Sequence, residues 1–164
     1  MATPSVDPVA APDAAARLLA QDLLARARHA SLSYLDPATA TPGISRIAFG
    51  LDPQGGPLTL ISALSQHAGA LRAHADCAVM VGEVGDKGDP LTHPRLMMQA
   101  RAVFVAADDP ARPDLRAHWL KGHPKAALYV DFADFAFCRL VPVAALLNAG
   151  FGRAYRMTVA DLHG

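Results

Sequence analysis

Residues 44–67 read ISRIAFGLDPQGGPLTLISALSQH. From position 47 to position 51 every second residue is apolar, which is the spacing of a strand with one buried face. Asp-Pro-Gln-Gly-Gly-Pro at positions 52–57 has the composition of a tight turn, and the apolar segment 58–61 returns from it. We therefore predict a β-hairpin formed by segments 44–51 and 58–61.

The segments on either side of this hairpin have the patterns of a few helices and several strands. Apolar residues of segment 13–30 recur at helical spacing, and Pro12 with Asp13 suits a helix start. Strand and helix do not alternate regularly, so a barrel with a few packed helices is favoured over a doubly wound sheet. The predicted fold class is mainly β with α, of the α+β kind. The other predicted elements are strands at 31–35, 77–84, 95–106, 135–141 and 153–159, helices at 65–74 and 113–121, a loop at 85–94, a turn or short helix at 142–147, and a segment at 126–132 that fits a helix or a strand.

Length and composition fit one globular domain. The chain has 164 residues, of which 52% are apolar and 18% charged, so it can bury a sizeable core. We predict that residues 13–164 form this domain and that residues 1–12, rich in alanine and proline, form a flexible arm. Fifteen basic residues balance fifteen acidic ones, which argues against nucleic-acid binding. Neither a membrane span nor a signal peptide is recognisable, so we expect a cytoplasmic protein with no membrane partner.

The sequence lacks the common motifs of catalytic and metal-binding sites. Gly82, Gly85 and Gly88 are followed by Asp-Pro rather than by a helix, which excludes a dinucleotide-binding loop. Seven histidines are present, but none stands at ligand spacing with a cysteine or carboxylate, so we predict no metal site. Cys77 and Cys138 lie in apolar segments and are expected to be buried thiols in a reducing compartment.

Several short motifs occur in an order that resembles a known family. They are SALSQH at 62–67, PRL at 94–96, HP at 123–124, two DF pairs within 131–135, and GFGRA at 150–154. Together these motifs resemble the pyridoxamine 5′-phosphate oxidase-related family, in its HugZ-like heme-utilisation branch. The resemblance implies an FMN-binding split β-barrel that works as a homodimer, with the flavin between two subunits.

The resemblance also implies a cofactor site, and the residue types present there suit an anion. Ser62 and Ser65 offer hydroxyl groups at the start of predicted helix 65–74, whose free N–H groups attract phosphate. His67 matches by position the Lys or His that related flavin barrels place beside the phosphate. Each of these residues also has a structural interpretation, such as capping the helix. The remaining candidates for cofactor binding are Ser45, Arg46, Arg95 and Gln99.

The chain departs from the family pattern within the predicted cofactor site. Relatives carry Thr, Arg and Asn where this chain has Ala68, Gly69 and Ala70. A phosphate-binding arginine is therefore missing from its usual position. Either Arg46 or Arg72 takes its place, or FMN binds weakly or not at all.

Three functions remain open from the sequence. One is an FMN-dependent oxidoreductase with an unknown small-molecule substrate and no assignable catalytic residue; another is a non-catalytic flavin- or heme-binding protein; the third is heme degradation. Asp131 and Asp134 fit either an acid–base pair or a turn. We expect FMN to bind better than hemin, because His67 serves the phosphate and the C-terminal extension of heme-binding relatives does not follow Gly164.

Overall fold

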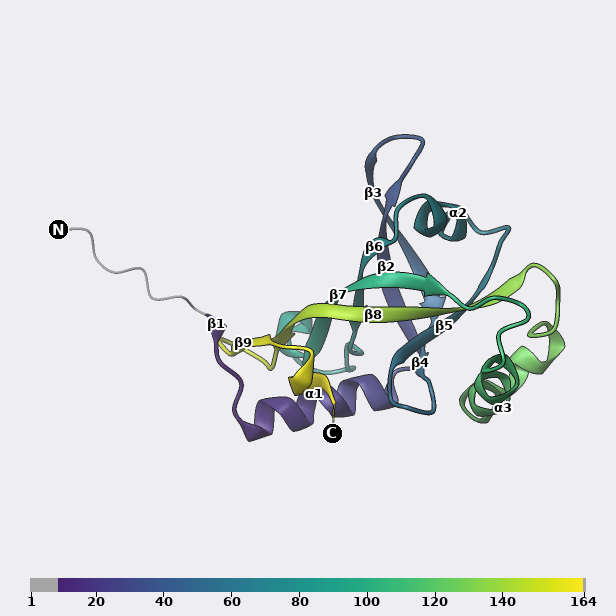
Figure 1. Ribbon diagram of the computed structural model, residues 1–164. Helices are drawn as coiled ribbons and strands as arrows, with labels where there is room; N and C mark the ends of the chain where they lie inside the picture. Colours follow the sequence, from purple (N-terminus) through teal and green to yellow (C-terminus); the bar gives the residue numbers. More distant parts are fainter. Residues whose placement is uncertain (1–8, 164) are drawn as a thin grey trace.

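One long strand with two sets of neighbours organises the fold. In the computed structural model, which describes residues 9–163, β8 (Phe135–Asn148) pairs with β7 (Arg95–Phe104) along one edge. The other edge of β8 pairs first with β5 (Pro57–Ser62) and then with β9 (Ala154–Met157). β8 therefore belongs both to the barrel and to a smaller strip of sheet beside it (Figure 1).

The sheet closes on itself because one strand changes partner after a bend. β4 (Gly50–Leu51) follows β3 (Thr41–Ala48) after Phe49 and pairs with β5. Thr59 Oγ1 on β5 also donates to the carbonyl oxygen of Ala48 at 2.6 Å. The closed path runs β3, β2 (His29–Asp36), β6 (Asp76–Val81), β7, β8, β5 and back through β4. This arrangement confirms the predicted α+β split barrel.

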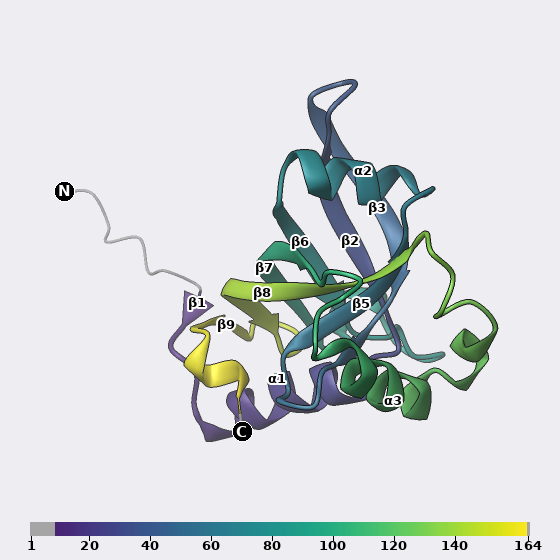
Figure 2. The ribbon, with the colours of Figure 1, turned by 45° about the vertical axis from the view of Figure 1, so that its right-hand side comes forward.

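Two helices lie at opposite ends of the barrel, and a third lies beside it (Figures 1 and 2). α1 (Ala14–Arg26) begins after Asp13, whose Oδ1 accepts a hydrogen bond from the Ala16 N–H at 2.7 Å. α2 (Gln66–Ala73) lies at the other end, and α3 (Arg112–Gly122) packs near β4. The predicted helix 13–30 extends too far at its C-terminal end: α1 ends at Arg26, and β2 already starts at His29.

The core has two parts. The first fills the barrel and includes the buried faces of α1 and α2; the second lies between β5, β8, α3 and the short 3₁₀ helix η2 (Pro124–Leu128). The largest fully buried side chains of the first part include Phe49, Leu32, Leu96, Met98 and Leu147, and those of the second include Phe137, Leu58 and Leu115.

Two predictions about strands need correction. The hairpin of 44–51 with 58–61 exists only as the short β4–β5 pair, because β3 pairs along its whole length with β2 and β5 pairs mainly with β8. The turn or helix at 142–147 is wrong: those residues continue β8. Pro142 lies beside a β-bulge, where Ala100 faces Pro142 but Gln99 faces Ala144. Proline has no backbone N–H to donate to the neighbouring strand, and a bulge tolerates this because the ladder is already interrupted there.

The remaining elements lie at the edges of the fold. β1 (Val9–Ala10) pairs in parallel with β9, so these two residues of the predicted arm belong to the sheet. Residues 1–8 of that arm lie outside the described part. η1 (Pro90–Thr92) interrupts the loop before β7, and η3 (Ala160–Leu162) follows β9. Within residues 9–163, no helix has the length and hydrophobicity needed to cross a membrane.

Candidate functional site

The junction between β5 and α2 holds two of the predicted cofactor-binding hydroxyls, and both already have protein partners. Ser62 Oγ donates to Asp134 Oδ2 at 2.6 Å and accepts from the Leu64 N–H at 3.1 Å. Ser65 Oγ donates to the carbonyl oxygen of Ser62 at 2.8 Å and accepts from the Ala68 N–H at 3.3 Å. Ser65, rather than Ser62, is therefore the N-cap of α2.

Asp134 gives this junction an acidic character that the sequence did not reveal. It lies in the turn before β8, and β8 reaches the junction because Ser62 pairs with Phe135. Its neighbour Asp131 points elsewhere and forms a two-pronged ion pair with Arg116, at 2.8 and 2.7 Å. That ion pair lowers the pKa of Asp131. The two aspartates thus have separate partners rather than forming an acid–base pair.

His67 lies on α2 with its ring half-buried near Tyr34. The two ring centroids are 6.2 Å apart at an angle of 50°. Burial lowers the pKa of His67, so its imidazole is neutral at pH 7. Tyr34 is buried, and its ring fills the space that a side chain at Gly43 would occupy. His67 thus lies on the helix at one end of the barrel, and its partly buried ring favours the neutral form.

The other four predicted residues do not converge with these three. The pairing register sets Ser45 opposite the buried Leu32, so Ser45 faces the barrel interior. Arg46, Arg95 and Gln99 fall on the opposite side of the sheet, which we call the outer face. Within a single chain, the seven candidates are thus divided among the α2 junction, the interior and the outer face.

The outer face is the side of β3, β2, β6, β7 and β8 that points away from the barrel core. Gln99 lies on it between Ala78 of β6 and Ala144 of β8. Arg95 uses Nη1 to donate to the carbonyl oxygen of Leu91 at 3.0 Å, so this side chain holds the loop around η1. The exposed apolar side chains of the outer face are Ile44 (75% exposed), Met80 (43%), Val103 (47%), Val141 (46%) and Val143 (64%). The same face also carries exposed polar side chains, those of Arg46, Gln99 and Arg101.

A shallow pocket occurs where β2 and β6 separate below α2. Its volume is about 280 Å³, and its polar lining residues include Ser33, Tyr34, His74, Asp76 and Cys77. β2 and β6 pair only as far as Ser33 and Ala78, so the barrel wall opens there. Burial and the neighbouring Asp76 raise the pKa of Cys77 to about 11, so this thiol is protonated at pH 7. Sequence reasoning missed the pocket, because it depends on where a non-local strand pair ends.

Metal ligands do not cluster in the part of the chain that the structure describes. No group of three His, Cys, Asp or Glu side chains in residues 9–163 is placed to hold an ion. Cys77 and Cys138 are both free thiols, and burial raises the pKa of Cys138 to about 12.

Known proteins resemble this chain in both sequence and fold. No family model matches it. The noncanonical heme oxygenase HOZ, a chloroplastic protein of Arabidopsis thaliana, is 32% identical over 114 residues, which are 70% of this chain and 34% of HOZ. The protein Atu2129 of Agrobacterium tumefaciens, of unknown function, is 32% identical and superposes with a TM-score of 0.81 over 99% of this chain and 66% of its own. The heme-binding protein of Mycobacterium smegmatis has a TM-score of 0.80 at 23% identity, over 94% of this chain and 61% of its own.

The chain belongs to the HugZ-like branch of the pyridoxamine 5′-phosphate oxidase-related split-barrel family. This HugZ-like chain spans about a third of the length of the curated relative that it matches. A third solved structure, 44% identical, superposes with a TM-score of 0.83 over 92% of this chain and 97% of its own. The HugZ-like fold is therefore present at nearly this chain length in another protein.

Proposed function

We propose that this chain binds heme, with His67 as a ligand of the iron. The observation that carries the proposal is the hydrogen bond from Ser62 to Asp134 at the junction where FMN phosphate was expected. A carboxylate at this place repels a phosphate dianion, whereas heme has no phosphate group and needs no phosphate-binding site. The contacts of Ser62 and Ser65 thus fit FMN poorly, and we propose that hemin binds better than FMN, the opposite of the order expected from the sequence.

His67 suits an iron ligand through its protonation state and its surroundings. Its lowered pKa leaves a neutral ring at pH 7, and neutral imidazole is the form that binds metals. Heme, when bound, supplies an iron that accepts such a ligand and a flat ring that apolar side chains contact. Four other histidines are already in contact with carboxylates or backbone atoms: His29, His74, His93 and His123.

The named relatives support the same proposal. The curated relative is called a heme oxygenase, and the neighbour from Mycobacterium smegmatis is called a heme-binding protein. The first likeness extends over 70% of this chain at 32% identity, and the second rests on fold alone.

We also propose that the working unit is a homodimer in which the outer face is covered by a second copy. Exposed apolar side chains gather on this face, as is typical of a surface that binds a partner. Two-fold dimers are the commonest oligomers, and a two-fold axis places one such face against its copy. A dimer would also bring residues from two chains to the site that a single chain leaves divided.

FMN binding by an oxidoreductase remains the second candidate. It is favoured by the junction itself, where the first turn of α2 directs backbone N–H groups outward next to two serines. On this alternative, FMN binds more tightly than riboflavin because of its phosphate.

Titration of the purified protein with hemin, FMN and riboflavin tests both candidates. We expect stoichiometric hemin binding with a sharp Soret band, weakened about tenfold or more by His67→Ala. His163→Ala is the control, because within residues 9–163 the hydrogen bonding of His163 involves only its backbone oxygen, which accepts from Gln21. FMN and riboflavin should bind equally weakly. Tight FMN binding with weak riboflavin binding, or hemin binding that is unchanged by His67→Ala, would contradict the heme proposal.

A further inference from the structure

Between α1, β4 and the end of α3 lies a pocket of about 310 Å³ that has no part in the site described above. Its wall carries four basic side chains: Arg28, His118, Lys121 and His123. None of its lining residues, all within 9–163, is acidic. The chain as a whole has equal numbers of basic and acidic residues, so this local excess of positive charge differs from the average surface.

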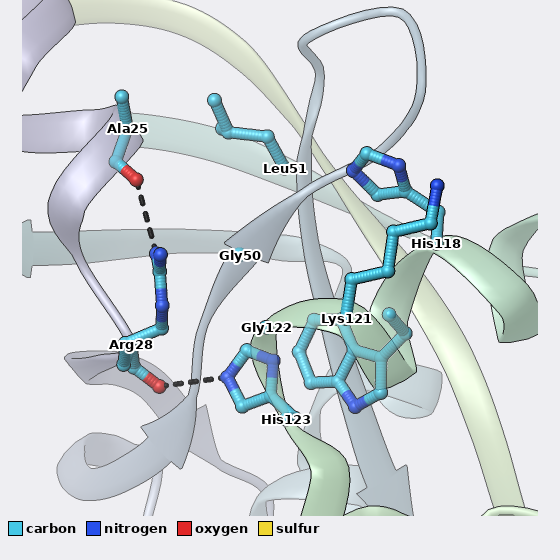
Figure 3. A pocket seen from close by; sticks show the side chains of 9 residues that line it. Ala25, Arg28, Gly50, Leu51, His118, Lys121, Gly122 and His123 are labelled. Atoms are coloured by element: carbon cyan, nitrogen blue, oxygen red, sulfur yellow. Dashed lines mark hydrogen bonds between the residues drawn. The ribbon is translucent and has the colours of Figure 1, made fainter.

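The basic groups stand on two sides of the pocket (Figure 3). Arg28 projects from one side, while His118 and Lys121, one helical turn apart on α3, project from the other. Gly50 and Leu51 of β4 lie between the two sides. An anion in the pocket would therefore meet cations on both sides.

The structural duties of these residues account for only part of the charge. Arg28 caps the end of α1. Within residues 9–163 the hydrogen bonds of its side chain use only Nη1, which donates to the carbonyl oxygens of Ala25 at 3.0 Å and Ala27 at 3.1 Å. Lys121 and His118 have no hydrogen-bond or ion-pair partner recorded within residues 9–163. A cation near a helix C-terminus offsets the helix dipole, but that role does not require two basic side chains facing a cavity.

His123 is held in a fixed orientation at the base of the pocket. Its Nε2 donates to the carbonyl oxygen of Arg28 at 3.1 Å, and its ring stacks on Trp119 at 4.0 Å and 7°. This hydrogen bond fixes the proton on Nε2 and leaves Nδ1 facing away from Arg28. Gly50 permits the stack, because a Cβ there would lie 3.2 Å from the Trp119 ring.

An apolar surface continues from the charged end. Ala25 and Leu51 also line a neighbouring pocket of about 270 Å³, which Leu24 and Leu162 border. The first pocket alone reaches the lower size range of small-molecule sites. We propose that the pocket binds a small organic anion, with its carboxylate or phosphate group between Arg28 and Lys121 and its carbon skeleton against Ala25 and Leu51.

The single tryptophan of the chain gives a direct probe, because Trp119 lines this pocket. We would follow Trp119 fluorescence during titration with potassium phosphate, potassium succinate and potassium chloride at constant ionic strength. We expect a saturable change with phosphate, with succinate or with both, and none with chloride. If the fluorescence change saturates with only one of the two anions, that anion shows whether the ligand carries a phosphate or a carboxylate group. No saturation with either anion would overturn the proposal.

Charge-removing variants show whether the pocket is the binding site. Lys121→Gln and Arg28→Gln should each weaken the saturating anion about tenfold or more, because each removes one charge-assisted contact. Lys87→Gln is the matched control, since Lys87 is exposed and lies on the loop before η1. Circular dichroism checks that each variant is folded. Equal affinity in Lys121→Gln, Arg28→Gln and the parent would contradict the proposal.

Discussion

Gly43 and Tyr34 illustrate how the conformation of one side chain restricts the residue opposite. A Cβ at Gly43 would lie 2.6 Å from two atoms of the Tyr34 ring. Gly43→Ala must therefore displace a buried aromatic ring, and we expect it to lower the free energy of unfolding by about 1–3 kcal/mol. Urea denaturation followed by circular dichroism measures this difference.

Gly69 offers the matched comparison. It lies inside α2, and apart from the neighbouring residues and backbone of that helix nothing lies within 4 Å of the position its Cβ would take. Gly69→Ala should raise the free energy of unfolding by about 0.5–1 kcal/mol, because alanine is the better helix former. If both variants shifted stability in the same direction, the close contact at Tyr34 would not be the cause.

Asp134 is predicted to oppose FMN binding at the α2 junction. Asp134→Asn removes the negative charge but keeps an oxygen that can accept from Ser62. If the carboxylate repels phosphate, this variant should bind FMN about tenfold more tightly, with riboflavin unchanged. Calorimetric titration of both flavins tests it. An equal gain for riboflavin would show that the charge does not act on the phosphate.

The contrast between Ser62 and Asp134 shows what the local sequence can predict about the site. Ser62, Ser65 and His67 stand close in sequence at a strand-to-helix junction, so their proximity was predictable. Asp134 is separated from Ser62 by 72 positions. It reaches the junction only through the pairing of β5 with β8, which no local pattern encodes. For the same reason the sequence could not show that Ser45, Arg46, Arg95 and Gln99 lie apart from the junction within one chain, since the direction of these side chains depends on strand register.

Among the elements, β8 departs most from its sequence pattern. Pro142 suggested a break, yet the strand continues through it because the bulge adds one residue opposite β7. Apolar periodicity was sufficient for α1, α2 and most strands, where a buried face repeats. It failed where a proline or a change of pairing partner interrupts the pattern. The β3–β4 bend at Phe49 is the second such place, and there the predicted hairpin gave way to two separate pairings.

The bulge in β8 should tolerate the loss of its extra residue. Deleting Val143 would leave a regular β7–β8 ladder in which Pro142 still faces Ala100 and Ala144 still faces Gln99, so the next residues of the strand keep their place in the core. We expect the variant to fold and to lose about 1–3 kcal/mol of stability, because the bend that the bulge gives β8 is lost. Inserting one glycine after Gly55, where the turn has open space, should cost less than about 1 kcal/mol. Thermal unfolding measures the stability of both variants, and a deletion variant that fails to fold would contradict this account of the bulge.

The contact between α1 and the segment after β9 should depend on pH. Asp161 accepts from Arg17 at 2.6 Å and from Thr158 at 2.7 and 2.8 Å, and these bonds lower its pKa to about 2. A carboxylate with a lowered pKa in the folded state adds stability above its unfolded pKa, near about 3.9, and loses it as the pH falls toward 2. Asp161→Asn should therefore be less stable than the parent from pH 5 to pH 8, with the gap closing below about pH 4.

The matched control for this pH dependence is Asp22→Asn. Asp22 forms an exposed pair with Arg26 within α1 at 2.7 Å, and such pairs add little stability. Melting temperatures of both variants across pH 2–8 test the comparison. If the difference in melting temperature between the parent and Asp161→Asn stayed constant down to pH 2, the charge of Asp161 would not stabilise the fold.

For the molecule as a whole, the closure of the barrel could be predicted from the family resemblance but not from periodicity. Local patterns give strands and helices without saying that β8 has three neighbours or that β4 returns the sheet to β5. The order of short motifs along the chain supplied that information, because it identifies a fold in which these pairings occur. The same resemblance implied a homodimer, and we propose the outer face as its interface.

The dimer prediction depends on the apolar part of the outer face. A stable interface buries about 800 Å² on each partner, and a charged side chain introduced among its apolar residues must be desolvated when the interface forms. Val143 is 64% exposed on this face, so Val143→Lys should leave the monomer folded. In the dimer the new lysine would be desolvated next to the partner's apolar face, which we expect to weaken association about a hundredfold.

Sedimentation velocity at micromolar concentration distinguishes the two states. The parent should sediment as a dimer and Val143→Lys as a monomer, while Leu128→Lys should remain a dimer. Leu128 is 80% exposed but belongs to η2, beside α3 rather than on the outer face. If the parent sedimented only as a monomer, the proposed dimer would be wrong. If it were a dimer that Leu128→Lys, but not Val143→Lys, dissociated, the interface would lie beside α3, and the outer face would be free to bind something else.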